Sequence, residues 1–280
     1  EIVQDLGKGH PMNRLLDGDV GSGKTLVAAI AAVNVARAKA QTAVLAPTTL
    51  LARQHFQTFS RWLLPLRIRV GCLVAQEAYL AGDAGVEACS RRDFLKKLRA
   101  GEIDMIIGTH ALLGKAVSFA KLALAVVDEQ HRFGVEERKV LREKGGKELM
   151  PHLLSMTATP IPRTLALTFY GDLDISLLNE LPPGRIPIRT TLVSPDRRPD
   201  AYRFLRKEVM RGRQVFVVCP RIDATDIAGA RSVRAEYERL RKEVFPDFRL
   251  GMLHGRMARA ERERTMGEFV EGDVQILVAT

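Results

Sequence analysis

The sequence predicts an α/β protein of two domains whose sheets are mostly parallel. A length of 280 residues corresponds to about two domains at roughly 100–200 residues each. Short apolar runs alternate with helical patterns, which is typical of a parallel sheet covered by helices. A Pro- and Gly-rich stretch interrupts both patterns near residue 185. We therefore expect domains at 1–180 and 191–280, joined by a linker at 181–190.

Five apolar runs in the first half have the length of strands, and each is followed by a polar or Gly-containing segment. They are Arg14–Leu16, Ala43–Ala46, Ile103–Ile107, Leu122–Val127 and Leu153–Met156. Ligands of open α/β sheets bind at the carboxyl ends of the strands. We therefore expect the functional residues to follow these runs directly.

Helical patterns separate the strands. Four apolar residues recur at spacings of four and three, which predicts one buried helix face: Ala52, Phe56, Phe59 and Leu63. Ser90 and Asp93 fit a capping box at the start of another helix, and Gly101 stands where its C-terminal cap would be. These helices are expected to cover the sheet.

The same alternation restarts after the linker. Apolar positions mark helices that end near Gly212 and Pro246, and the expected strands are Val215–Cys219, Leu250–Leu253 and Val274–Ala279. The last apolar run stops at Thr280 without a turn or a cap, and the first residue is Glu1 rather than Met. We therefore expect the chain to continue beyond both ends and the second domain to be truncated.

Charge and cysteine usage narrow the class of protein. The formal net charge is +10, which suits a polyanionic partner such as nucleic acid, although many basic proteins bind none.

The three cysteines, Cys72, Cys89 and Cys219, form no CxxC pair and no zinc-like cluster, so we expect buried thiols in a reducing compartment. The uncharged run Thr25–Ala36 is too short to cross a bilayer and no signal peptide is present, so we expect a cytoplasmic protein without a membrane partner.

A phosphate-binding loop is the most specific motif in the sequence. Its eight residues match GxxxxGK[ST] between a predicted strand and a predicted helix: Gly18, Asp19, Val20, Gly21, Ser22, Gly23, Lys24 and Thr25. Glycines let backbone N–H groups curve around phosphate oxygens, and the helix N-terminus favours an anion. We expect Lys24 to reach the outer phosphates of ATP and the Thr25 hydroxyl to bind Mg²⁺. The rival dinucleotide fingerprint lacks its third glycine, because Leu26 stands there.

Two carboxylates follow the apolar strand Leu122–Val127. We expect Asp128 to hold Mg²⁺, through water, and Glu129 to orient and deprotonate the attacking water. His131, two residues beyond Glu129, could bond across to the segment after the next strand. There Thr157 and Thr159 offer short hydroxyls that can sense the γ-phosphate and pass its state to a neighbouring domain.

Taken together, five motifs resemble a superfamily 2 helicase. They are GDVGSGKT (18–25), APTTLL (46–51), GTH (108–110), DEQH (128–131) and TAT (157–159). Their flanks are similar to the RecG family, in DEQHRFGVEER (128–138), MTATPIPRTLALTFYGDLD (156–174) and ELPPGRIPIRT (180–190). HGRM (254–257) and ILVAT (276–280) fit the second motor domain of that family, so the resemblance spans essentially the whole chain.

The resemblance implies two RecA-like domains that bind ATP at their cleft and remodel branched DNA as a monomer. It implies that Gln130 also couples the two domains, together with His131, Thr157 and Thr159. It also places one group of residues along the DNA or beside the nucleotide: Pro47, Thr48, Thr49, Thr109, His110, Arg221, His254, Gly255, Arg256 and Thr280.

Departures from the family pattern limit what this chain is expected to do. By the resemblance, we expect this segment to lack the family's N-terminal wedge module and the arginine fingers that follow Thr280 in the family pattern. The segment Leu73–Ala75 also lacks a usual Gly-Ser pair. Since an arginine finger contributes about 10³–10⁵ in turnover, the isolated segment should be weakly active. Two alternatives stay open. One is an Mfd-like transcription-repair coupling translocase, and the other is a non-catalytic nucleotide- or DNA-binding module.

Overall fold

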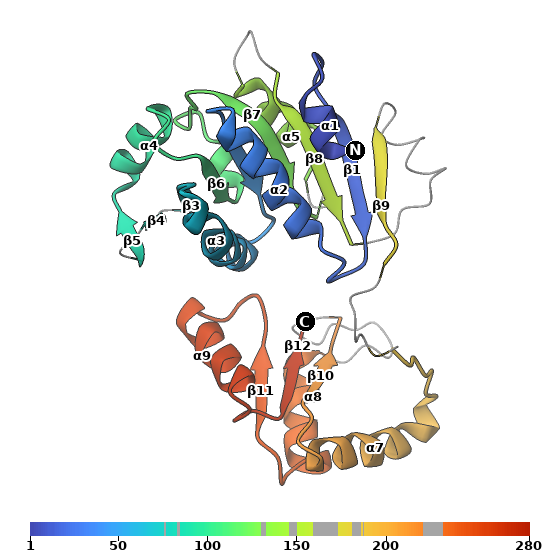
Figure 1. The fold of residues 1–280 in the computed structure, drawn as a ribbon. Coiled ribbons are helices and arrows are strands. Elements are labelled where there is room, and N and C mark those ends of the chain that lie inside the picture. The colour runs from blue at the N-terminus through green and yellow to red at the C-terminus, as the bar shows by residue number, and fades with distance from the viewer. Residues whose placement is uncertain are drawn as a thin grey trace. The chain divides into compact units, whose positions relative to one another are not determined.

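A computed structural model describes residues 1–75, 77–82, 85–129, 133–145, 150–158, 173–180, 186, 188–220 and 232–280. The chain divides into two compact units, Glu1–Ile186 and Pro187–Thr280, drawn in Figure 1. None of the helices within these ranges combines the length and the apolar character that a membrane span requires.

The first unit is built on one large sheet. Within the described ranges nine strands lie in the order β5-β4-β3-β6-β2-β7-β8-β1-β9, and only the pairs β3–β4 and β4–β5 are antiparallel. The strands are β1 (Asn13–Gly18), β2 (Gln41–Leu45), β3 (Val70–Val74), β4 (Glu77–Gly82), β5 (Gly85–Cys89), β6 (Met105–Gly108), β7 (Leu122–Val127), β8 (His152–Thr157) and β9 (Asp174–Leu178). The expected α/β class with a mostly parallel sheet is confirmed.

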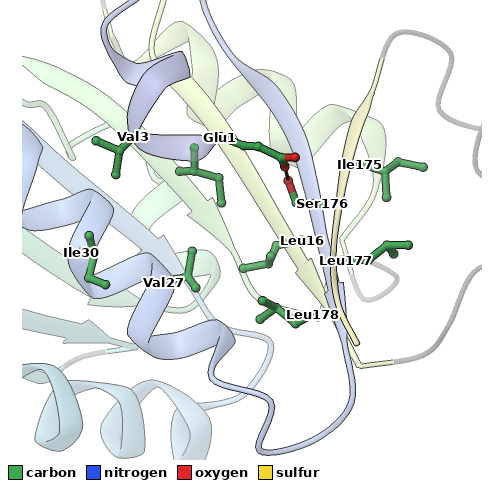
Figure 2. A pocket seen from close by; sticks show the side chains of 10 residues that line it. Glu1, Val3, Leu16, Val27, Ile30, Ile175, Ser176, Leu177 and Leu178 are labelled. Atoms are coloured by element: carbon green, nitrogen blue, oxygen red, sulfur yellow. Dashed lines mark hydrogen bonds between the residues drawn. The ribbon is translucent and has the colours of Figure 1, made fainter. Parts of the chain in front are cut away.

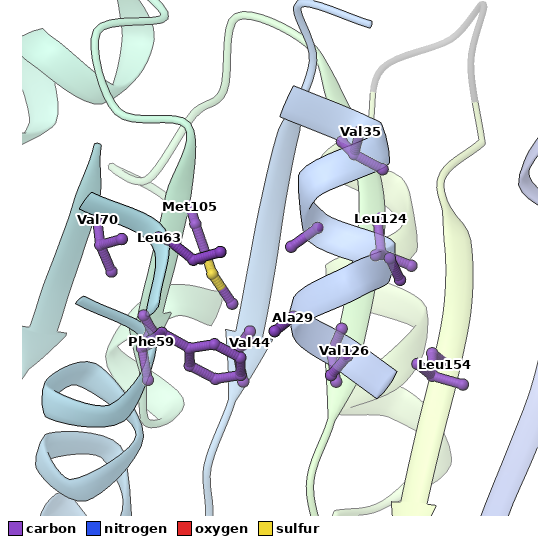
Figure 3. Packing of buried hydrophobic residues seen from close by; sticks show 14 of the residues in the cluster. Ala29, Val35, Val44, Phe59, Leu63, Val70, Met105, Leu124, Val126 and Leu154 are labelled. Atoms are coloured by element: carbon purple, nitrogen blue, oxygen red, sulfur yellow. The ribbon is translucent and has the colours of Figure 1, made fainter. Parts of the chain in front are cut away.

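Helices cover both faces of this sheet. The short α1 (Ile2–Leu6), α2 (Lys24–Arg37) and α3 (Thr49–Leu63) pack on one face, and α4 (Arg91–Arg99) and α5 (Val135–Glu143) pack on the other (Figure 1). Side chains alternate across the strands, so Val44 joins the cluster under α2 and α3 (Figure 3), whereas Ala43 and Leu45 join the opposite one. The parallel central strands are therefore buried on both faces and end at one common edge.

Most elements of the first unit lie where the sequence predicts them. The expected helix face of Ala52, Phe56, Phe59 and Leu63 is buried, and Ser90 accepts a hydrogen bond from the Asp93 N–H as the N-cap of α4. Strand β6 starts at Met105, two residues later than expected. The sequence interpretation missed four strands, β3, β4, β5 and β9.

The second unit has a small parallel sheet in the order β10-β12-β11. Its described strands and helices are α7 (Arg198–Met210), β10 (Val215–Val218), α8 (Val233–Arg239), β11 (Leu250–Leu253), α9 (Arg259–Val270) and β12 (Ile276–Ala279). The helix expected to reach Val244 changes after Arg239 into a π-helical turn, Leu240–Val244, just before Pro246. Its core gathers Val233, Leu240, Phe245, Ile276 and Val278.

The three thiols do not all behave as expected. Cys72 and Cys219 are buried, and burial raises the pKa of Cys72 to about 12. Cys89 is only half-buried, because it ends the edge strand β5.

Candidate nucleotide-binding site

The predicted phosphate-binding loop joins the end of β1 to the start of α2. Gly21 and Gly23 have φ angles of 83° and 98°, a left-handed backbone that favours glycine. At Gly18 a Cβ atom would lie 2.6 Å from Ser22 Oγ and 2.9 Å from the Leu178 Cβ, so a side chain cannot fit between the loop and β9. From Asp19 to Gly21 the loop is exposed, and it opens directly onto the N-terminus of α2.

Two polar groups, Lys24 Nζ and Ser22 Oγ, lie within this loop. Lys24 Nζ donates to the backbone oxygens of Gly18 at 2.5 Å and of Asp19 at 2.9 Å. Ser22 Oγ is buried and has no hydrogen-bond partner among the described residues. A buried hydroxyl without a partner is unfavourable, and an anion in the loop would satisfy it. The loop therefore has the donors that a phosphate needs.

The acidic pair lies at the same edge of the sheet. Asp128 directly follows β7, and only β8 separates β7 from β1 in the strand order. All three strands are parallel, so their carboxyl ends meet at one edge. Two strand spacings amount to about 10 Å. The glycine loop and Asp128 therefore lie at the same edge of the sheet, about two strand spacings apart.

Neighbouring groups fix the position of Asp128. Its backbone N–H donates to the Leu45 oxygen at the end of β2, at 2.9 Å. Its Oδ1 accepts from the Glu129 N–H at 3.1 Å, and its Oδ2 lies 2.7 Å from His55 Nε2. Glu129 has a φ of 52°, which is uncommon for a residue with a side chain.

Of the coupling residues, the described ranges include only Thr157. It ends β8, is 1% exposed, and pairs in register with Asp17 of β1, so it lies between the acidic pair and the loop. Gln130, His131 and Thr159 lie outside the described residues.

The donor set could hold a magnesium ion together with a phosphate chain. Mg²⁺ usually takes one or two carboxylates plus substrate phosphates and waters rather than an all-protein cage. Thr25 and Asp128 supply one hydroxyl and one carboxylate, and the described ranges contain no cluster of three His, Cys, Asp or Glu that could bind a metal alone. These residues fit a metal that arrives with a nucleotide.

The residues expected to contact DNA in the first unit follow β2 and β6, which are neighbours in the sheet. Thr48 is exposed, and its hydroxyl caps α3 by accepting from the Leu51 N–H at 3.2 Å. Pro47, Thr49 and Thr109 are half-buried. A fifth residue, His110, is more than half exposed and lies 3.1 Å from Glu137 Oε1, with its ring tilted against Phe133.

In the second unit the corresponding residues gather at one sheet edge. Gly255 and Arg256 follow β11 and are exposed. Thr280 follows the adjacent β12, and its backbone N–H donates a hydrogen bond to the Leu253 oxygen. His254 is 5% exposed, and its Nδ1 has no hydrogen-bond partner in the part of the chain that the structure describes. Arg221 lies outside the described residues.

Comparison with protein families decides the class of protein. The family model described as DEAD/DEAH box helicase matches residues 1–168. The chain belongs to the DEAD/DEAH box helicase family. A second model, described as helicase conserved C-terminal domain, matches residues 200–280, so both units carry helicase signatures.

Within this helicase family, the chain is similar to proteins named ATP-dependent DNA helicase RecG, as the sequence resemblance predicted. It is 48% identical over 282 residues to that of Pasteurella multocida and 46% identical over 281 residues to that of Thermotoga maritima. These alignments cover all of this chain but only 39% and 34% of the two relatives, so the chain spans about a third of their length.

Solved structures give the same assignment for the helicase fold. A structure of RecG bound to a three-way DNA junction superposes with a TM-score of 0.74 at 42% identity, covering 100% of this chain and 34% of the RecG chain. The DEAD-box helicase Mss116, bound to single-stranded RNA and UDP-BeF, has a TM-score of 0.65 at 16% identity, which supports the fold alone.

Away from the helicase motifs, a cavity of about 620 Å³ lies between α1, α2 and β9 (Figure 2). Its walls are mostly apolar: Ile2, Val3, Leu16, Val27, Ile30, Ile175, Leu177 and Leu178, with Glu1 and Ser176 hydrogen-bonded to each other. It contains none of the residues predicted from the motifs.

The sequence interpretation missed His55, which lies against Asp128. His55 is within an ordinary amphipathic helix pattern, 73 residues before its partner. No local motif connects the two, and only the neighbouring positions of β2 and β7 bring them together.

Proposed function

We propose that this chain is the ATP-hydrolysing motor segment of a RecG-type DNA helicase or translocase that remodels branched DNA. The observation that carries the proposal is the placement of the glycine loop and the Asp128–Glu129 pair at one sheet edge, with a single strand between them. The relatives named RecG and the junction-bound RecG structure support DNA, and branched DNA in particular, as the substrate.

Each residue at this edge would have a distinct role. The backbone N–H groups of the loop and Lys24 would bind the phosphates of ATP, and the Thr25 hydroxyl and Asp128 would hold Mg²⁺. The bound ion would neutralise charge that develops on the phosphates. Glu129 would orient a water and accept its proton. Thr157, which is buried and pairs in register with Asp17 of β1, would sense a change at the γ-phosphate.

The DNA contacts would be made to the sugar-phosphate backbone. Hydroxyl groups and backbone N–H groups such as those at Thr48, Thr49 and Thr109 carry little information about bases, which suits a motor that moves along any sequence. An Mfd-like translocase is the weaker alternative, because relatives 43–48% identical to this chain are named RecG.

Single-turnover hydrolysis of labelled ATP, with protein in excess and with forked DNA present, tests this function. We expect Lys24→Ala to weaken ATP binding. Glu129→Gln should bind ATP normally but hydrolyse it about 10²–10⁴-fold more slowly, because the base is gone. Glu87→Gln, on the exposed edge strand β5, is the matched control and should behave as the parent chain.

The same assay separates a motor from a passive binding module. The parent chain should turn over slowly but measurably, since it spans only about a third of its relatives. If the parent chain binds ATP but does not hydrolyse it, the chain acts as a binding module. If it hydrolyses ATP and Glu129→Gln changes nothing, Glu129 is not the base.

A further inference from the structure

His55 contacts the carboxylate expected to hold magnesium. Its Nε2 lies 2.7 Å from Asp128 Oδ2, and both side chains are only 13% exposed. A carboxylate can only accept hydrogen bonds, so Nε2 carries the proton and donates. Partial burial makes such a charge-assisted bond stronger than a bond in open solvent.

This contact leaves Asp128 able to bind a metal. Oδ2 accepts from His55 and Oδ1 accepts from the Glu129 N–H, whereas a carboxylate offers about four acceptor sites. One lone pair on each oxygen stays available to a metal or to its bound water. The two donors thus fix the plane of the carboxylate and leave a lone pair on each oxygen free for a metal.

The ring of His55 is itself held by the core. It lies against Phe59, with ring centroids 5.9 Å apart, and Phe59 packs edge-on against Trp62 at 6.4 Å. Phe59 is fully buried. These three residues share α3. Any movement of that helix relative to β7 would therefore move the His55 donor relative to the Asp128 carboxylate.

Helix α3 also begins at the segment proposed to contact DNA. Thr48 caps its N-terminus, and His55 follows seven residues later, about 10 Å along the helix axis. A helix packed on the sheet over most of its length is a stiff link between these two points. The geometry places a DNA-facing end and a metal-facing side chain on one rigid element.

We propose that His55 is a positioning residue for Asp128, and that through α3 it couples DNA binding at Pro47–Thr49 to the binding of magnesium nucleotide. This inference rests on the proposed function. It assigns to His55 an outer hydrogen-bonding role beside a metal ligand, and loss of such a partner typically lowers metal affinity about 10–100-fold. Coupling is reciprocal, so DNA and magnesium nucleotide should each tighten the binding of the other.

Equilibrium binding of a fluorescent, non-hydrolysable ATP analogue tests the inference, with Mg²⁺ or with EDTA and with or without forked DNA. His55→Phe keeps the ring packing on Phe59 but removes the donor. We expect it to lose most of the Mg²⁺-dependent gain in affinity, about tenfold or more, while its affinity in EDTA stays unchanged. The gain on adding DNA should shrink in parallel, and His55→Gln, whose amide can reach Oδ2, should restore both.

Controls separate this inference from the proposed function and from misfolding. Arg61→Ala, an exposed residue of the same helix, should match the parent chain in every condition. Full Mg²⁺-dependent and DNA-dependent gains in a folded His55→Phe chain would overturn the inference and leave the proposed function standing. If the parent chain bound no analogue in either condition, both would fail.

Discussion

At the residue scale, one buried amide holds three segments of the first unit together. Gln41 is 3% exposed at the start of β2. Its Nε2 donates to the oxygens of Leu98 and Ile103 at 2.9 and 2.8 Å, and its Oε1 accepts from the N–H groups of Ala120 and Lys121 at 2.7 and 3.1 Å. The side chain thus joins the end of α4 and the segments before β6 and β7. All of its hydrogen-bonding capacity is used.

Replacing Gln41 by leucine keeps the volume but removes four hydrogen bonds. The backbone groups left without partners should lower the free energy of unfolding by about 3 kcal/mol or more, since each such group typically costs about 1–3 kcal/mol. Urea denaturation measures the change. Gln57→Leu, an exposed position on α3, should stay within about 0.5 kcal/mol of the parent chain. Equal effects at the two positions would contradict this role of Gln41.

At the element scale, a buried ion pair fixes α1 to the sheet. Asp5 of α1 is 4% exposed and accepts from Arg14 Nε of β1 at 2.8 Å, and Lys8 Nζ lies 2.5 Å from its other oxygen. Arg14 also bonds to Ser176 of β9, at 3.0 Å. The hydrogen bond from Lys8, and then Arg14, holds the pKa of Asp5 below its ordinary value of 3.8.

This depressed pKa gives stability a definite dependence on pH. The folded chain releases the Asp5 proton more readily than the unfolded chain, so the contribution is complete above the ordinary carboxyl pKa and is lost as the pH falls through the lowered one. We expect Asp5→Asn to be destabilised at pH 7 and to differ less from the parent chain below pH of about 4. Denaturation curves across this range provide the test, and a constant difference would contradict it.

Several elements could be predicted from the sequence because their signals are local. The run Leu122–Val127 is a strand at those same residues, and the capping pair Ser90–Asp93 starts α4. The glycine loop depends on residues adjacent in sequence, so the sequence alone also predicts its position between β1 and α2.

Other features depend on contacts that no local pattern encodes. The β4–β5 hairpin has mixed small and charged residues and extends the sheet at an exposed edge, so its alternation of polar and apolar positions is weak. Strand β9 is only partly buried, because it lies at the edge of the described sheet and pairs there with β1. The contact between His55 and Asp128 is set by tertiary packing.

At the scale of the whole molecule, charge should govern the affinity for DNA. The chain carries a formal net charge of +10, and contacts to phosphate release bound cations from DNA. We expect the affinity for forked DNA to fall about tenfold or more between roughly 50 and 200 mM salt, with little dependence on base sequence. Fluorescence anisotropy over a salt series measures both. A flat response, or a strong preference for one sequence, would argue against movement along the DNA backbone.

The claim on which the account depends is that one edge of the first sheet holds both a triphosphate and its metal. A crystal structure of the chain with Mg²⁺ and a non-hydrolysable ATP analogue tests it most directly. The outer phosphates should lie about 3 Å from Lys24 Nζ and from backbone N–H groups of the loop. The metal should bind the Thr25 hydroxyl and reach Asp128 directly or through one water. An analogue bound away from the loop, or a metal out of reach of Asp128, would contradict the account.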